Sequence, residues 1–330
     1  MPFKILDIFK ANLDKPSIEK IINENKKEIN YVFGRTKQTP LILAIEDGRT
    51  EIIELLLKNN ADTDYSCPFT GENAIHEAVR LGDLPIMKIL LNHINDIDET
   101  DNQGISGLHL AVKEGHFSII EILIERGSRV NEKDSWKWTS LHWAALNGDK
   151  KVIELLLARG ADINAVTNEG LSPLHIAAGE GNYLAMELLL NKGAYINIVD
   201  NSNSTPLQYV VSNPGDDYQL VEKMIIRGAN INTQDINGDS ALHIAINCWN
   251  FEITRILLKY NANIDMQNLE GNTALHISVD MLWYEISKLL ILYRAKTDIK
   301  NYDDLTPREY ADNIGNQSMI DIFNSLRRKN

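Results

Sequence analysis

Residues 139–164 read TSLHWAALNGDKKVIELLLARGADIN, and this stretch contains most of the information that decides the fold. Thr139 is a suitable helix N-cap, and Gly148 interrupts the apolar pattern that follows it. After Gly148, apolar residues return at helical spacing, as at Val152 and Leu156, until the LLLARG segment ends in a second glycine. The stretch therefore predicts two short helices that are separated by a tight turn and followed by a polar loop.

The same pattern recurs along almost the whole chain at intervals of about 33 residues. Each copy opens with a block similar to TPLH and closes with a block similar to ADIN. One pair of short helices cannot bury its apolar faces alone, whereas stacked copies can bury them against each other. The sequence therefore predicts an array of repeats that open at Thr39, Asn73, Ser106, Thr139, Ser172, Thr205, Ser240, Thr273 and Thr306.

These motifs resemble those of the ankyrin-repeat family in the TPLH-like blocks, the glycine between the helices and the GADIN-like endings. The resemblance implies an all-α fold, an ankyrin-repeat α-solenoid with β-hairpin fingers, an N-terminal capping hairpin and about nine repeats. We expect the capping hairpin at residues 1–35, ankyrin repeats at 36–305 and a C-terminal capping repeat at 306–330. Family members bind partners on a concave face that is formed by the fingers and the first helix of each repeat.

Composition and charge exclude several classes of protein. The 330 residues include 33 lysines and arginines and 46 aspartates and glutamates, which gives a formal net charge of −13. Proteins that bind duplexes usually carry a basic face, so we expect no nucleic-acid partner. The two cysteines, Cys67 and Cys248, are too few for a disulfide framework or a four-thiolate metal site.

The sequence also bears on location. No apolar run approaches the ~20 residues that a helix needs to cross a bilayer, and the first residues lack the apolar core of a secretory signal. We therefore expect a cytoplasmic protein without membrane insertion. A specialised secretion signal, of the kind that intracellular bacteria use, would escape this test.

The motif histidines do not indicate metal or proton chemistry, because each occupies the same position in its own repeat and they lie a layer apart. In ankyrin repeats this histidine makes local hydrogen bonds between helix and finger. No phosphate-binding loop, zinc-protease motif or serine-hydrolase motif occurs, and the repeats fill nearly the whole chain. We therefore expect no enzymatic activity, no catalytic residue, no metal and no cofactor. The motif histidines are His76, His109, His142, His175, His243 and His276.

The finger of the fourth repeat is the first candidate binding site. Trp136 and Trp138 lie within three residues of a predicted turn, where exposure of two indoles to water is unfavourable. Tryptophan is enriched at binding hot spots, although packing against neighbouring fingers is the alternative explanation. Trp143, which follows the motif histidine, fits a structural role. The predicted contact residues are Ile105, Trp136, Trp138, Leu146, Glu169 and Leu171.

A second candidate patch lies near the ends of two adjacent first helices and consists of Cys248, Trp249, Met281 and Trp283. In these two repeats the usual glycine between the helices is lost. The patch fits an apolar surface for a partner or for self-association. It fits equally well a contact between repeats that replaces the lost glycines, and the sequence leaves both interpretations open.

The acidic residues suggest what a partner is like. Several of them fall at or near predicted concave positions, namely Glu114, Glu169, Glu180, Asp239 and Glu270. We therefore expect a partner protein with a basic surface or peptide and an apolar anchor. Solubility of a long array is an alternative reason for the acidic excess.

The functional hypothesis is a protein–protein interaction module, which would act as an adaptor. The abundance of asparagine, isoleucine and lysine also occurs in proteins of intracellular bacteria, and such a source would favour a secreted effector that engages a host protein in the host cytoplasm. The alternative hypothesis is a regulatory or inhibitory subunit that blocks an enzyme or a basic nucleic-acid-binding surface.

Overall fold

A computed structural model describes residues 4–10, 13–35, 37–213 and 218–327 of the protein. The chain divides into two compact units, Met1–Asp162 (unit 1) and Ile163–Asn330 (unit 2). The regular structure is helical, and the described residues contain no β-strand. This confirms the all-α fold that the sequence predicts.

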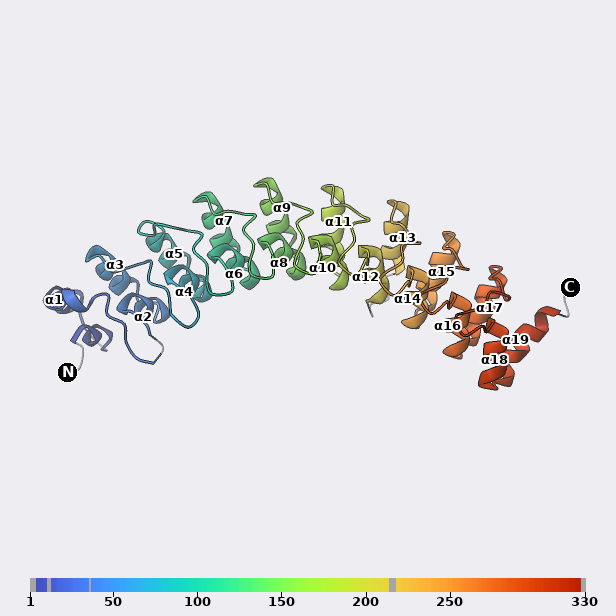
Figure 1. Cartoon of the computed structure of the whole chain (residues 1–330). Coiled ribbons are helices and arrows are strands. Elements are labelled where there is room, and N and C mark those ends of the chain that lie inside the picture. Colours follow the sequence, from blue (N-terminus) through green and yellow to red (C-terminus); the bar gives the residue numbers. More distant parts are fainter. Residues whose placement is uncertain (1–3, 11–12, 36, 214–217, 328–330) are drawn as a thin grey trace. The chain divides into compact units, whose positions relative to one another are not determined.

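Unit 1 contains four helix pairs after an N-terminal segment. In that segment the 3₁₀ helix η1 (Lys4–Phe9) packs on α1 (Lys15–Glu24), and η2 (Lys26–Glu28) follows. The first helices of the pairs, α2, α4, α6 and α8, contact one another in sequence order, and each contacts the second helix of its own pair (Figure 1). The helices are α2 (Pro40–Glu46), α3 (Thr50–Lys58), α4 (Ala74–Leu81), α5 (Leu84–Leu90), α6 (Gly107–Glu114), α7 (Phe117–Glu125), α8 (Ser140–Asn147) and α9 (Lys150–Ala158).

Unit 2 repeats this arrangement with five pairs. Its first helices, α10, α12, α14, α16 and α18, contact one another in sequence order, and each contacts its own second helix. The helices are α10 (Pro173–Gly179), α11 (Tyr183–Asn191), α12 (Pro206–Ser212), α13 (Tyr218–Ile226), α14 (Ala241–Asn247), α15 (Phe251–Lys259), α16 (Ala274–Asp280), α17 (Tyr284–Leu292), α18 (Pro307–Ile314) and α19 (Gln317–Arg327).

The first helices start where the sequence predicts, because a short polar side chain satisfies the free N–H groups there. In α2 the Thr39 hydroxyl accepts a hydrogen bond from the Ile42 N–H group, and in α10 Ser172 accepts one from His175. Proline occupies the first turn of α2, α10, α12 and α18, where its missing N–H group has no partner to lose.

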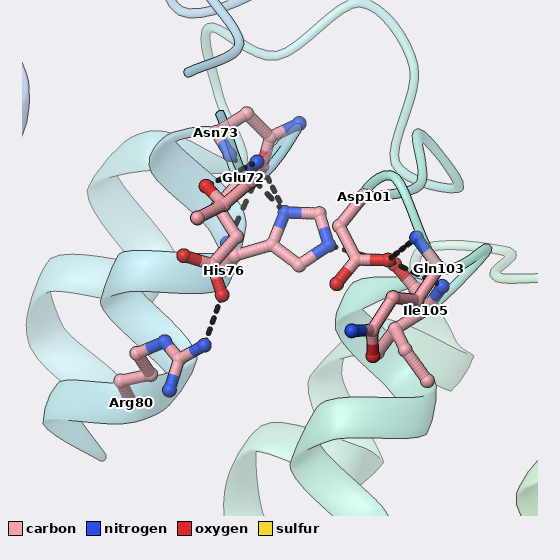
Figure 2. A network of polar contacts seen from close by, with 8 residues as sticks. Glu72, Asn73, His76, Arg80, Asp101, Gln103 and Ile105 are labelled. Carbon is pink, nitrogen blue, oxygen red and sulfur yellow. Dashed lines mark hydrogen bonds and ion pairs between the residues drawn. The ribbon is translucent and has the colours of Figure 1, made fainter. Parts of the chain in front are cut away.

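Motif histidines connect several first helices to the finger that follows. In Figure 2 the His76 ring lies between Asn73 and the chain segment that ends at Ile105. The Nδ1 atom of His76 accepts the Asn73 N–H group, and Nε2 contacts the Ile105 carbonyl oxygen at 2.8 Å. In the next repeat, Nδ1 of His109 accepts from the Ser106 N–H group and Nε2 donates to the Glu132 carbonyl. The histidines are therefore structural, as the resemblance implies.

The core consists of the apolar residues that define the helical pattern. In the fourth repeat, Leu141 and Ala145 of α8 and Val152 and Leu156 of α9 are all buried. Each buried leucine or valine contributes about 1.5–3 kcal/mol relative to an exposed one. The repeated apolar positions thus supply the stability that a single helix pair lacks.

In the described residues the fingers between the repeats are turns without β-strands, so the β-hairpins that the resemblance implies are not confirmed. Each turn is closed by a few local backbone bonds, such as those from the Asp134 N–H group to the Trp138 carbonyl and from the Lys137 N–H group to the Asp134 carbonyl. Neighbouring fingers are joined by one further bond, such as that from the Ser135 N–H group to the Gln103 carbonyl in unit 1. The pairing between segments is too short to form strands, and isolated bridges such as Thr100–Ser106 remain.

The sixth repeat shows which property of the histidine the fold requires. Gln208 replaces it, and its Oε1 atom accepts the Thr205 N–H group at 2.8 Å. Its Nε2 atom donates to the Asp239 carbonyl of the next finger at 2.9 Å. The fold therefore requires one acceptor and one donor at a fixed spacing, and an amide supplies both.

The histidine contacts predict a pH dependence of stability. Burial lowers the pKa of His109 from the usual 6.5 to about 4, because a charged ring would be desolvated and would lose its Nδ1 acceptor. As the pH falls from 6.5 towards 4, the unfolded chain binds a proton that the folded chain does not. The free energy of unfolding should therefore fall by about 3 kcal/mol through this site alone, which urea unfolding at several pH values will measure.

The matched variant is His109→Gln, which copies the contacts of Gln208 without a titrating ring. We expect it to fold and to lose less stability than the wild type between about pH 7 and about pH 4. An identical pH dependence of the two proteins would show that His109 does not contribute to acid unfolding.

Candidate partner-binding surfaces

The finger of the fourth repeat is held by one buried carboxylate. The Oδ1 atom of Asp134 accepts hydrogen bonds from the Trp136 and Trp138 N–H groups at 2.9 and 2.8 Å. Lys137, between them, adopts a positive φ of 60°, which reverses the chain. Bonds between the Asp134 carboxylate and backbone N–H groups thus hold the turn, and the Trp136 ring takes no part in them.

The two tryptophans of this finger have different environments. Trp136 is 45% exposed at the fingertip. Trp138 is half-buried, and its ring lies 4.7 Å from that of Trp143 and 5.8 Å from that of His142. The Trp143 ring also has a cationic neighbour, because the Lys113 Nζ atom lies 5.0 Å from its centroid. Trp138 and Trp143 therefore belong to a packed cluster, and Trp136 is the tryptophan that this finger exposes to solvent.

The carboxylate that holds this turn is itself perturbed. Burial raises the pKa of Asp134, while hydrogen bonds from the Trp138 and Trp136 N–H groups and the nearby Trp143 indole act in the opposite direction. The second carboxylate oxygen, Oδ2, and the Trp143 Nε1 atom have no hydrogen-bond partner within bonding distance. The Trp143 indole is thus near enough to stabilise the carboxylate charge but does not form a short hydrogen bond.

The remaining residues of the first candidate set fall in different environments. Ile105 is buried, with its N–H group bonded to Asp101 and its carbonyl to His76, and it therefore offers little surface to a partner. Leu146 is half-buried in α8 of unit 1. Glu169 is exposed and Leu171 half-buried, and both belong to unit 2.

The second candidate patch is brought together in unit 2. The rings of Trp249 and Trp283 lie 5.1 Å apart at an angle of 35°. Trp249 is 56% exposed, Cys248 is also exposed, and Met281 is half-buried. Both interpretations of the patch are thus compatible with the structure, because it is a contact between repeats that also leaves apolar surface in water.

The geometry explains why Trp249 reaches Trp283. Trp249 occupies the turn position that glycine holds in other repeats, and its φ is 57°. In unit 1, a Cβ atom on Gly82 would lie 2.8 Å from the His116 ring of the following repeat. A side chain at this position therefore points towards the N-cap of the next second helix, and in unit 2 that N-cap is Trp283.

A third feature has no counterpart among the predicted residues. Ile236, Leu269 and Tyr302 follow the residue that opens each finger in three successive repeats of unit 2, and they are 63%, 65% and 75% exposed. We call these three residues the fingertip row. The sequence held one signal for this row, the regular spacing of about 33 residues between the three apolar side chains. Isoleucine, leucine and tyrosine are common residue types, so no single member of the row stands out in the sequence.

Beside the fingertip row lies a groove of about 340 Å³, which we call the unit-2 groove. It is lined by the fingers of the seventh and eighth repeats, by the ends of α14 and α16, and by Tyr310 of α18. Met281 of the second candidate patch also lines it. Two acidic residues that the sequence analysis placed near the concave face, Asp239 and Glu270, contribute to its lining.

Two further findings concern chemistry and membranes. No group of three or more histidine, cysteine, aspartate or glutamate side chains is placed to hold a metal ion in the described part of the chain. Among the helices that the structure describes, none is long and apolar enough to cross a bilayer.

Comparison with known proteins identifies the fold family. A family model described as "Ankyrin repeats (3 copies)" matches residues 8–101, 76–167, 108–200, 141–235 and 207–303. The chain belongs to the ankyrin-repeat family. Its repeats are of a kind that generally serves protein–protein interaction and that is typically non-catalytic.

One relative of the ankyrin-repeat chain is the mouse (Mus musculus) protein named Ankyrin repeat and SAM domain-containing protein 6, which is 32% identical over 80 residues. The aligned segment covers 24% of this ankyrin-repeat chain and 9% of the mouse protein. The similarity therefore extends to a small part of that relative and concerns the repeats.

The different environments of the two finger tryptophans predict different effects on stability. Trp138→Ala should lower the free energy of unfolding by about 2 kcal/mol, because it removes a half-buried ring and its contact with Trp143. Trp136→Ala should change it by less than about 0.5 kcal/mol. Urea unfolding followed by circular dichroism will measure both, and equal effects would contradict the proposed division of roles.

The glycine-like turns of unit 2 give a second comparison. Leu282 and Trp249 both have positive φ, which disfavours a side chain by about 1–2 kcal/mol. Leu282→Gly should therefore raise stability, by about 0.5 kcal/mol after the entropy of glycine is included. Trp249→Gly should instead lower it, since the contact with Trp283 is lost. The midpoints of urea unfolding test this, and stabilisation by both substitutions would exclude a structural role for the stacked rings.

Proposed function

We propose that this ankyrin-repeat chain is an adaptor that binds a partner protein through the exposed indole of Trp136. The observation that supports the proposal is a large aromatic side chain, 45% exposed, on a turn whose backbone is already fixed by Asp134. A rigid turn loses little conformational entropy when it binds, and that increases the net affinity of a contact. A tryptophan in such a position has the properties of a binding hot spot.

The charge around Trp136 differs from that of the chain as a whole. Lys133 and Lys137 flank the indole on the same finger, although the net charge of the chain is −13. The same finger also carries Glu132 and the buried Asp134, so its two acidic and two basic side chains leave it with no net charge. We propose that Trp136 supplies apolar contact and that attraction for a basic partner comes from acidic residues elsewhere, of which the unit-2 groove holds three.

The proposal is tested by pull-down and mass spectrometry from lysate of the source organism or of its host cell. The wild type is compared with Trp136→Ala, which should lose specific partners because the anchor is removed while the fold is retained. Circular dichroism establishes that each protein is folded before the pull-down.

The matched control is Leu184→Ala, which removes an exposed apolar side chain from the second helix α11. It should retain the partners that Trp136→Ala loses. If both variants retain every partner, Trp136 is not the anchor. If the wild type captures no specific protein, the adaptor function itself is contradicted.

A further inference from the structure

The fingertip row is a rigid apolar surface. The Leu269 N–H group donates to the Asn237 carbonyl at 2.9 Å, and the Tyr302 N–H group donates to the Glu270 carbonyl at 3.1 Å. These bonds fix the spacing between three successive fingers. A Cβ atom on Gly271 would lie 2.7 Å from the Tyr302 Cδ1 atom, so glycine is needed for this close approach. The exposed side chains therefore stand on a backbone that is ordered before any partner binds.

The unit-2 groove beside this row is acidic. Its lining includes the carboxylates of Asp239, Glu270 and Asp280, together with asparagine amides and the Tyr310 ring. Among the residues that line it in the described part of the chain, none is lysine or arginine. The groove is too small for a folded domain but has room for long side chains of an extended segment.

Neutral groups hold the three carboxylates in place. Asp239 accepts from the Asn268 amide at 3.0 Å, Glu270 from the Asn272 amide at 2.9 Å, and Asp280 from the Tyr310 hydroxyl at 2.8 Å. These donors orient the carboxylates without neutralising them. The negative charge therefore remains available to a cation from outside.

The charges also act on each other. Burial raises the pKa of Asp239, and the negative charges of Asp235 and Glu270 raise it further, against the hydrogen bond from Asn268 and the opposing effect of His243. A cation placed in the groove would relieve this repulsion. Arginine is the best fit, since its planar guanidinium can bond carboxylates and amide oxygens at the same time.

We propose that the unit-2 groove binds an arginine-bearing extended segment of a partner protein, whose apolar side chains lie on the fingertip row. This inference rests on the proposed adaptor function and assigns to unit 2 a contact separate from Trp136. A basic partner would account for the acidic residues of the groove. Apolar contacts with that partner would account for the three large side chains of the fingertip row, which are exposed and do not belong to the core.

The test is a selection of random dodecapeptides, displayed on phage, against the immobilised full-length chain. The best peptide is then labelled, and its Kd for purified variants is measured by fluorescence polarisation. We expect arginine next to leucine, isoleucine or an aromatic residue in the enriched peptides, and weaker binding at higher salt.

Two variants test the two parts of the surface. The double variant Glu270→Gln with Asp280→Asn removes two charges, yet its new amide oxygens can still accept from Asn272 and Tyr310. We expect it to weaken the peptide by about tenfold or more. Leu269→Ser, which interrupts the fingertip row, should weaken it by about tenfold. The controls Glu285→Gln and Leu184→Ser change an exposed charge and an exposed leucine elsewhere in unit 2 and should leave Kd within about twofold.

The outcomes separate this inference from the proposed function. Enriched peptides that are acidic or neutral, or that bind the double variant as tightly as the wild type, would overturn the groove proposal. If Trp136→Ala still loses its partners in the pull-down, the adaptor function stands without the groove. A second copy of the chain as the occupant would appear as a dimer by light scattering that the double variant abolishes, and this too would overturn the proposal.

Discussion

The structure depends on one hydrogen-bonded connection that recurs in the second, third and fifth to eighth repeats, through a buried side chain at the third position of the first helix. One atom of that side chain accepts the N–H group of the cap, as Nδ1 of His109 does from Ser106, and another donates to a carbonyl of the following finger. The first partner is buried and the second is part-buried, and leaving such backbone groups without a hydrogen bond would cost stability. Because Gln208 makes the same two contacts, the connection depends on geometry and hydrogen bonding and does not require an imidazole.

This connection also determines which residues are free to vary. It fixes both ends of each finger, and a carboxylate or amide at the start of the turn, such as Asp134, organises the tip. At the second and third positions of the fourth-repeat tip, the bonds that hold the turn and join it to the neighbouring finger use backbone N–H groups, as at Trp136 and Ser135. Asparagine stands at the second position in one finger, at Asn201, and tyrosine in another, at Tyr302. Binding specificity can therefore change at the tips while the array remains intact, which is the property expected of an interaction module.

The sequence predicted the helix pairs, their caps and the repeat boundaries, because these follow from a period that many copies reinforce. The exposure of the individual finger residues was predicted less well. Trp136 and Trp138 looked equivalent in sequence, but the positive φ of Lys137 turns one outward and packs the other on Trp143. Ile105 looked exposed because it lies in a finger, yet its place directly before the Ser106 cap buries it. Exposure within a tight turn depends on individual backbone angles, and the period alone does not specify those angles.

The turns between the helices follow a different logic from the fingers. At Trp249 the array accepts a side chain where positive φ favours glycine, and the ring of Trp283 in the next repeat provides a contact that compensates. Neither residue takes part in the histidine connection or in the turns of the fingers. A repeat can therefore change at its helix-turn end without disturbing its finger. It follows that the Trp249–Trp283 contact and the fingertip row can be altered separately, and that their contributions to stability and binding should be nearly independent unless the two surfaces share a partner.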